Sequence, residues 1–159
     1  MDRRDFIRAG AAAIAAGAAA RAVAQAGGGT MHEHHHEAAS APAGAPGWER
    51  NAAVAEAASD CVRAGEICLE HCLRLLRAGD GSMARCSVAV DAMLAMCRAT
   101  AALAIQDAPY LKAVAAVCAK ACRDCEAACK EHAPHHEPCR RCMETCQKCA
   151  AACEKLGAA

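Results

Sequence analysis

Residues 118–153 read CAKACRDCEAACKEHAPHHEPCRRCMETCQKCAAAC, and nine of these residues are cysteine. Apart from one gap of ten between Cys129 and Cys139, each cysteine follows the previous one by three or four residues. Because an α-helix turns about every 3.6 residues, such steps place side chains along one face. Charged residues occupy positions between the cysteines. The stretch therefore predicts two amphipathic helices that bury thiols where such helices normally bury leucine.

The remaining cysteines lie upstream in two further segments with a helical pattern, over about residues 48–77 and 83–105. They are Cys61, Cys68, Cys72, Cys86 and Cys97. Glycines within residues 78–82 separate these two segments, and Pro109 precedes the third helix. Residues 132–138 form the loop before the fourth. Four helices with short connections predict an all-α, antiparallel up-down-up-down four-helix bundle with a cysteine-lined core.

Short loops also determine which helix ends meet at one end of the bundle, which we call the mouth. The residues expected there are His71, Cys72, Met83, Cys86, Cys129, His132, His135, His136 and Cys139. Deeper in the second helix, Met93 and Met96 are expected to fill the core rather than to bind metal. Gly65 occupies a position of the first helix where a further cysteine would fit the spacing.

The chain begins MDRRDFIRAG, in which Arg3 and Arg4 precede an apolar, alanine-rich run over residues 9–20. This start resembles a twin-arginine export signal, and small residues near 22–26 offer a cleavage site. Residues 1–26 are therefore predicted to be a signal peptide, which implies a periplasmic or otherwise extracytoplasmic protein. The alternative is a basic N-terminal helix that stays on the protein. No other segment is expected to span a membrane, so no membrane insertion is expected after signal removal.

Residues 27–48 combine three glycines, the patch MHEHHHE and the run APAGAPG, which together predict a disordered His-rich tether. The patch either binds soft or borderline metal ions weakly or is a solvated tail without a ligand role. Residues 49–157 then form the four-helix bundle domain. Without residues 1–26 the chain carries 14 basic and 16 acidic residues, so its charge indicates no nucleic acid partner.

Thiols in this number are typical of disulfides, zinc sites, iron–sulfur clusters or copper sites. Disulfides between helices remain an alternative, but they need only two cysteines per helix, and pairs within one helix close almost no loop. Zinc requires four converging ligands, and several tetrathiolate sites would leave uncompensated negative charge in the core. Iron–sulfur clusters are usually wrapped by loops, whereas a straight helix presents only two ligands to one small site.

Copper(I) fits the pattern on every count. The ion is soft, prefers thiolate and accepts two or three ligands, so a CxxxC pair on one helix can hold it. The pairs at this spacing are Cys68/Cys72, Cys118/Cys122, Cys125/Cys129, Cys142/Cys146 and Cys149/Cys153. Because nearly one Cu(I) can bind per bridging thiolate and each ion displaces a thiol proton, a loaded core stays near neutral.

The chain is also similar to a known family. The stretches MDRRDFIRAG, CVRAGEICLEHCLRLL, DGSMARC, VCAKACRDC and CRRCMETCQKCAAAC resemble the bacterial copper storage proteins, which are cysteine-lined four-helix bundles that bind many Cu(I) ions. The resemblance covers almost the whole chain and looks closest to the exported branch of the family. It implies that His71 and Met83 bind copper near the mouth, where copper enters. Leu75 and Ala78 stand where such members can carry methionine, and the mouth histidines are candidates to replace that sulfur.

These observations predict an exported store of multiple Cu(I) ions without enzymatic activity, because the thiols are too uniform for one activated nucleophile. The expected metal ligands are Cys61, Cys68, Cys72, Cys86, Cys97, Cys118, Cys122, Cys125, Cys129, Cys139, Cys142, Cys146, Cys149, Cys153, His71 and Met83. Copper chaperones or cuproenzymes are the expected further partners, and the resemblance implies a homo-oligomer, a tetramer. The alternative function is a disulfide-stapled helical structural protein with no metal role.

Overall fold

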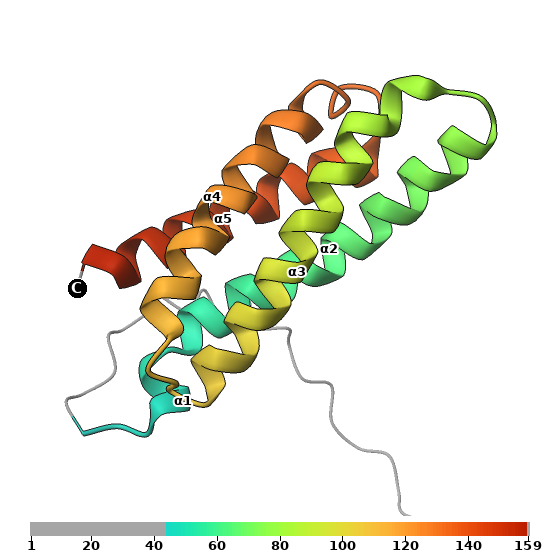
Figure 1. The fold of residues 1–159 in the computed structure, drawn as a ribbon. Coiled ribbons are helices and arrows are strands. Elements are labelled where there is room, and N and C mark those ends of the chain that lie inside the picture. Colours follow the sequence, from blue (N-terminus) through green and yellow to red (C-terminus); the bar gives the residue numbers. More distant parts are fainter. Residues whose placement is uncertain (1–43, 159) are drawn as a thin grey trace, which may run out of the picture. The chain divides into compact units, whose positions relative to one another are not determined.

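The computed structural model describes residues 44–158, and every regular element in this range is helical. Its elements are α1 (Gly47–Arg50), α2 (Ala52–Arg77), the short 3₁₀ helix η2 (Gly81–Met83), α3 (Ala84–Ile105), α4 (Leu111–Lys130) and α5 (Glu137–Ala158) (Figure 1). The predicted signal peptide and most of the predicted tether lie outside the described residues.

Helices α2 to α5 form a four-helix bundle. Helix α2 packs against α3, α3 against α4, α4 against α5, and α5 closes the bundle against α2. Because consecutive helices are joined by short turns and lie side by side, neighbouring helices run antiparallel (Figure 1). The prediction of an all-α four-helix bundle is confirmed. One detail differs, because Asn51, with φ −105° and ψ 11°, divides the predicted first helix into α1 and α2.

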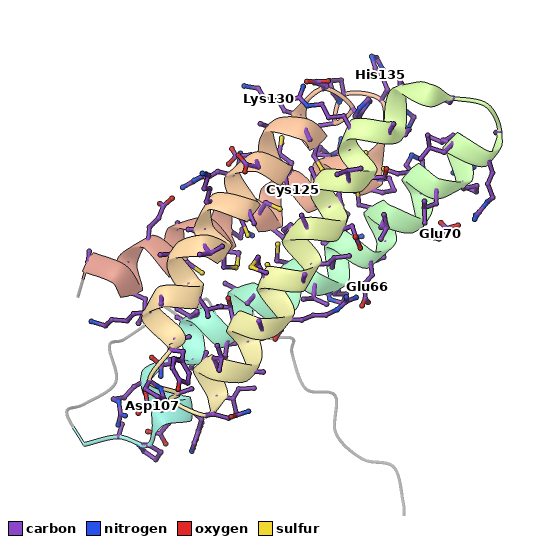
Figure 2. The ribbon with its side chains drawn as sticks, in the orientation of Figure 1. Glu66, Glu70, Asp107, Cys125, Lys130 and His135 are labelled. Atoms are coloured by element: carbon purple, nitrogen blue, oxygen red, sulfur yellow. The ribbon has the colours of Figure 1, made fainter. Side chains whose placement is uncertain are left out.

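Sulfur fills the centre of the bundle (Figure 2). All 14 cysteines are buried, each with at most 1% of its surface exposed. Cysteine packs as a small hydrophobe, so the protein can bury these side chains without metal. The larger apolar side chains of the core are concentrated on η2 and α3, where Met83, Val90, Met93 and Leu94 are buried.

The two ends of the bundle are built differently. At the end opposite the mouth, which we call the far end, Arg50 and Asn51 both hydrogen-bond the carboxylate of Asp107. These bonds hold the start of the bundle against the turn between α3 and α4. Gly47 is required there, because a Cβ would overlap the side chain of Asp107. At the mouth, Gly79 turns the chain between α2 and η2 with a φ of +94°, which favours glycine.

The segment Gly81–Ile105 is long and apolar enough to cross a membrane by length and composition alone. This finding contradicts the expectation that no segment beyond the N-terminal run would qualify. The apolar character comes from alanine and from the cysteine, methionine and leucine side chains that line the core. Because α3 packs against both α2 and α4, we attribute its composition to the packing of the bundle.

Candidate metal centre

The sulfur atoms of the core lie in five groups of three or four thiols. Within each group all sulfur atoms are within 4.8 Å of one another, and together the groups include every cysteine of the chain. They are Cys61/Cys97/Cys122/Cys149, Cys68/Cys72/Cys86/Cys139, Cys68/Cys129/Cys142, Cys118/Cys149/Cys153 and Cys125/Cys142/Cys146. All 14 cysteines are free thiols. The structure therefore offers soft ligands in sets of the size that a metal ion uses.

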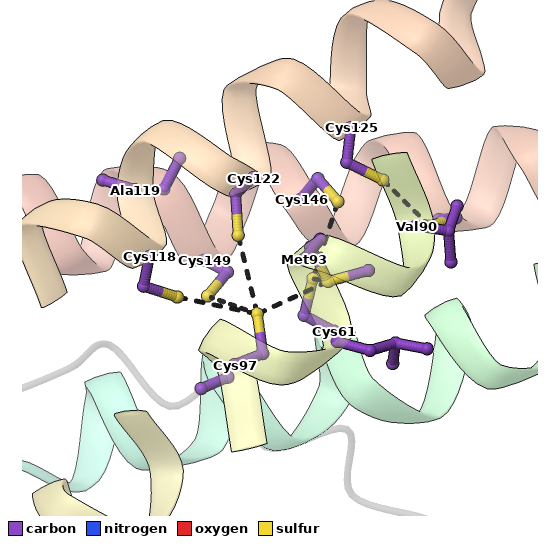
Figure 3. Packing of buried hydrophobic residues seen from close by; sticks show 14 of the residues in the cluster. Cys61, Val90, Met93, Cys97, Cys118, Ala119, Cys122, Cys125, Cys146 and Cys149 are labelled. Atoms are coloured by element: carbon purple, nitrogen blue, oxygen red, sulfur yellow. Dashed lines mark hydrogen bonds between the residues drawn. The ribbon is translucent and has the colours of Figure 1, made fainter. Parts of the chain in front are cut away.

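One group toward the far end is centred on Cys97 of α3. The Cys97 Sγ lies 3.6 Å from the Sγ atoms of Cys118 and Cys122 on α4, and 3.8 Å from the Cys149 Sγ on α5 (Figure 3). Cys61 of α2 belongs to the same group as Cys97. All four helices of the bundle therefore contribute to one cluster of ligands, although the sequence pattern showed only pairs along single helices.

The groups near the mouth and those near the far end are connected along α4 and α5. The Sγ atom of Cys125 lies 3.9 Å from that of Cys129 and 3.8 Å from that of Cys142. Cys146 completes this group, and its Sγ lies 3.6 Å from the Sγ of Cys61 in the far half. An ion bound near the mouth consequently has further sulfur ligands within reach along the whole core.

A histidine cluster lies at the mouth. The Nε2 atom of His71 is 3.0 Å from the Nδ1 atom of His136, and the ring centroids of His132 and His136 are 6.3 Å apart. Arg74 donates to Nδ1 of His71 at 3.0 Å, so the proton of the neutral His71 ring lies on Nε2 and is donated to His136. His135 lies at the same end and is exposed (Figure 2). The predicted mouth histidines are thus brought together next to the sulfur core.

Two residues near this end are held in the forms that bind metal ions. Burial, followed by the proximity of His136 and Arg74, holds the pKa of His71 below its usual value, so its ring is neutral at pH 7. Hydrogen bonds from neighbouring thiols, that of Cys125 first among them, lower the pKa of Cys129 to about 6. Neutral imidazole and thiolate are the forms that bind metal ions, so both residues are prepared for this role.

The core contains no cation to balance ionised thiols. Among residues 44–158 no charged side chain is buried, and the buried polar side chains are those of Asn51, Ser87 and Thr100. Arginine and glutamate pair on the exposed surface instead, as Arg98 and Glu66 do at 2.9 Å. Unbalanced thiolates in such a core are costly, and soft cations bound among the sulfur atoms would remove that cost.

Three residues outside the cysteine pattern differ in their placement. His71 lies in the histidine cluster, outside the five sulfur groups, and Met83 is buried in η2 with 1% of its surface exposed. Met93 was predicted to fill the core, because it lies on the buried face of α3. Its Sδ, however, lies 3.3 Å from the Cys61 Sγ and 3.5 Å from the Cys97 Sγ. The sequence feature that could have indicated this contact is the position of Met93, four residues before Cys97 on the cysteine-bearing face of the helix.

Several solved structures are similar to this chain. The apo form of copper storage protein 3 from Bacillus subtilis is 27% identical, with a TM-score of 0.59, and the match covers 67% of this chain and 98% of that chain. A cytosolic copper storage protein from Streptomyces lividans, in a structure with five coppers, is 32% identical, with a TM-score of 0.64 and coverage of 71% and 96%. Among curated protein sequences, none matches this chain.

The prediction of a periplasmic or otherwise extracytoplasmic location is wrong, because it conflicts with these comparisons. The similar protein from Streptomyces lividans is described as cytosolic. The export prediction rested on residues 1–26, which lie outside the described residues. Its physical basis was weak, since an arginine pair followed by alanine-rich sequence also suits a basic helix that stays on the protein.

The family comparison agrees with the fold and the sulfur core. The sequence model of the family described as Csp, copper storage protein, matches residues 48–158. This range contains all four helices of the bundle and all 14 cysteines. Because the match covers well over half of the chain, and the similar solved structures share its fold, the chain belongs to the copper storage protein family.

Proposed function

We propose that this protein stores many Cu(I) ions on the thiolates that line its bundle, with residues 49–157 as the copper-binding domain. The supporting observation is the set of 14 buried, free cysteines in five groups whose sulfur atoms lie within 4.8 Å. Bridging thiolates give a capacity on the order of one ion per cysteine. The proposed ligands are the 14 cysteines together with His71 and Met83.

The chemistry of loading is an exchange of protons for copper. Cu(I) is soft and takes two or three sulfur ligands, which the sulfur groups supply. Each ion that binds displaces a thiol proton, so one positive charge replaces another and the core keeps its net charge. This exchange allows ions to lie close together in a core without buried arginine or lysine.

Copper is proposed to enter through the mouth. His71, with its depressed pKa, offers a neutral imidazole there, and His132 and His136 lie beside it. Met83 lies buried at the same end and supplies a thioether. The far end is closed by the hydrogen bonds between α1 and Asp107, which supports the mouth as the route of exchange.

Storage accounts for the arrangement better than catalysis or disulfide stapling. All cysteines are equally buried, so no single thiolate is set apart with an activating partner, as a catalyst would need. The disulfide alternative has no support, because all 14 thiols are free. We also propose copper chaperones or cuproenzymes as exchange partners at the mouth. The family resemblance supports a homo-oligomer, with a tetramer as the proposed state.

An anaerobic titration tests the storage function. The full chain is reduced, its free thiols are counted, and Cu(I) is added in competition with a coloured Cu(I) chelator. The protein should withhold roughly a dozen or more ions before the chelator colours, because bridged thiolates bind nearly one ion each. The same chain with alkylated thiols is the control and should withhold almost none. If the unmodified protein withholds one ion or none, and its thiols count as paired, storage is excluded.

A further inference from the structure

We propose that the thioether of Met93 is a copper ligand, which together with the thiolates of Cys61 and Cys97 forms a mixed-sulfur Cu(I) site in the far half of the core, where it adjoins the mouth half. This site rests on the proposed storage function and adds to it a ligand of a different chemical class. It also gives a role to a side chain whose sequence position indicates only core filling.

The geometry of Met93 supports this role. Its Sδ lies 3.3 Å from the Sγ of Cys61 on α2 and 3.5 Å from the Sγ of Cys97 on α3. Figure 3 labels these three side chains in the packed core. All three side chains are fully buried. Cys61 and Cys97 already share one sulfur group, so the three sulfur atoms are as close together as those of the all-thiol groups. A three-coordinate Cu(I) therefore has a complete ligand set at this point.

The facing helix provides the space that Met93 needs. Gly65 of α2 stands where the cysteine stripe would continue, and a Cβ there would lie 2.7 Å from Cε of Met93 and 2.9 Å from Cδ2 of Leu94. Glycine inside a helix is unfavourable by about 0.5–1 kcal/mol relative to alanine, so its presence here indicates a packing requirement. The absent side chain lets the terminal methyl of Met93 fill the gap while its sulfur stays against the thiols.

A thioether adds a sulfur ligand without adding charge. When a single Cu(I) binds at this site, two thiol protons leave and two thiolates bind, while the third ligand is neutral; one proton leaves per ion once neighbouring ions share these thiolates. The complex is one unit less negative than a complex with three thiolates, which matters in a core without buried cations.

The position of the site suggests transfer between the two halves of the core. The Cys61 Sγ also lies 3.6 Å from the Cys146 Sγ, which belongs to the α4–α5 thiols. A thioether is a weaker and more easily displaced donor to Cu(I) than a thiolate. An ion held partly by Met93 can therefore exchange the thioether for a neighbouring thiolate and move on along α4 and α5.

Selenium X-ray absorption tests the Met93 ligand directly. The full chain is labelled with selenomethionine and loaded anaerobically with Cu(I), so that scattering between selenium and copper reports only copper bound to methionine. Met83 is itself a proposed ligand and Met31 belongs to the His-rich patch, so every sample, the parent included, carries Met83→Leu and Met31→Leu. Two further variants then add Met93→Leu or Met96→Leu. Leucine conserves volume and apolar character but cannot bind copper. Met96 is the matched control, because it lies on the same helix and is half-buried at the edge of the core.

The parent and the Met96→Leu variant should show copper–selenium scattering, and Met93→Leu should lose it. A parent without this signal, or a signal that persists in Met93→Leu, would overturn the site. The copper content of the same samples separates this result from storage itself. Retention of roughly a dozen ions without a copper–selenium signal removes only the Met93 ligand, whereas loss of copper from every sample removes storage as well.

A second variant guards against a folding defect in Met93→Leu. Gly65→Ala keeps every sulfur atom but places a Cβ against the methyl of Met93, so the thioether must move. The copper–selenium scattering should weaken while the number of bound ions stays the same. Unchanged scattering in a folded Gly65→Ala protein would contradict the proposed geometry.

Discussion

The two walls of the bundle, α4–α5 and α2–α3, contribute unequal numbers of thiols and of apolar side chains to the core. Helices α4 and α5 carry nine of the 14 cysteines, whereas α2 and α3 carry five. On the α2–α3 wall the thiols are interrupted by Gly65, Val90, Met93 and Leu94. One wall is thus an almost continuous set of copper ligands, and the other supplies much of the apolar volume. A core built to take up metal must still bury enough apolar surface to fold before metal arrives.

The largest expected effect is a loss of stability in Leu94→Ala. Leu94 is 1% exposed, and removing a buried leucine side chain costs about 2–5 kcal/mol of unfolding free energy. Urea denaturation of the reduced, metal-free protein measures this loss. The number of copper ions per folded molecule should not change, because no sulfur atom is removed. Leu73→Ala, at an exposed leucine of α2, is the control and should cost less than about 1 kcal/mol. Equal losses at the two leucines would contradict the structural role of the α2–α3 wall.

The next effect concerns the α4–α5 wall and appears in copper loading. The double variant Cys125→Ala and Cys146→Ala should bind about two ions fewer and should interrupt the chain of thiols between the two halves. The matched control removes Cys118 and Cys153, which share one sulfur group at the far end of the same wall. It should lose a similar number of ions but leave the link between the two halves intact.

Anaerobic titration counts the ions bound by each double variant, and the rate of copper withdrawal from a chelator measures filling of the core. Only the variant without Cys125 and Cys146 should fill slowly. If both variants load at the wild-type rate, these two thiols are not the path for copper.

A smaller change is expected for Gly65→Ala. The added Cβ meets Met93 and Leu94 at less than 3.0 Å, and such overpacking costs about 1–3 kcal/mol. The better helix propensity of alanine offsets up to about 1 kcal/mol, so a net loss of about 1 kcal/mol is expected in thermal or urea unfolding. Gly157→Ala in α5, where nothing lies within 4 Å, is the control and should be neutral or slightly stabilising. A gain of stability in both variants would show that the gap opposite Met93 is not needed.

The cysteine spacing was enough to predict which face of each helix is buried, because helical periodicity alone decides that. It could not predict that Cys97 meets Cys118 and Cys122, because such contacts depend on how far neighbouring helices are shifted along their axes. The contact of Met93 with two thiols depends in turn on a side chain that is missing across the interface, at Gly65. The cysteine spacing of one helix shows which of its faces is buried. A set of metal ligands, by contrast, is formed by several helices together.

Other parts of the sequence were less informative. The break at Asn51 was not predicted, because the helical pattern of residues 48–77 continues through it and the capping of the far end by Asp107 is a tertiary contact. The alanine-rich N-terminal run suggested export, since arginine pairs and small residues have more than one physical use. Short patterns outside the periodic core therefore predicted less than the cysteine stripes.

The smallest expected effect is at the mouth, in the pH dependence of stability. Burial, followed by the proximity of His136 and Arg74, lowers the pKa of His71 in the folded protein. Below about pH 6.5 the unfolded chain therefore binds more protons at this residue than the folded protein does, and stability falls as the pH falls. Above that pH both states are neutral at His71, and its contribution no longer changes.

The variant His71→Asn should remove this part of the dependence of the unfolding free energy on pH. Urea denaturation of the reduced, metal-free protein between about pH 5.5 and 7.5 measures it. His135→Asn, at an exposed histidine of the same end, should retain it. Protonation of His71 also competes with copper for the same imidazole. Initial copper uptake by the wild-type protein should therefore slow, as the pH falls through the depressed pKa of folded His71, more than uptake by His71→Asn does. Parallel stability curves together with parallel uptake curves would exclude His71 as the titrating group and as the imidazole with which protons and copper compete.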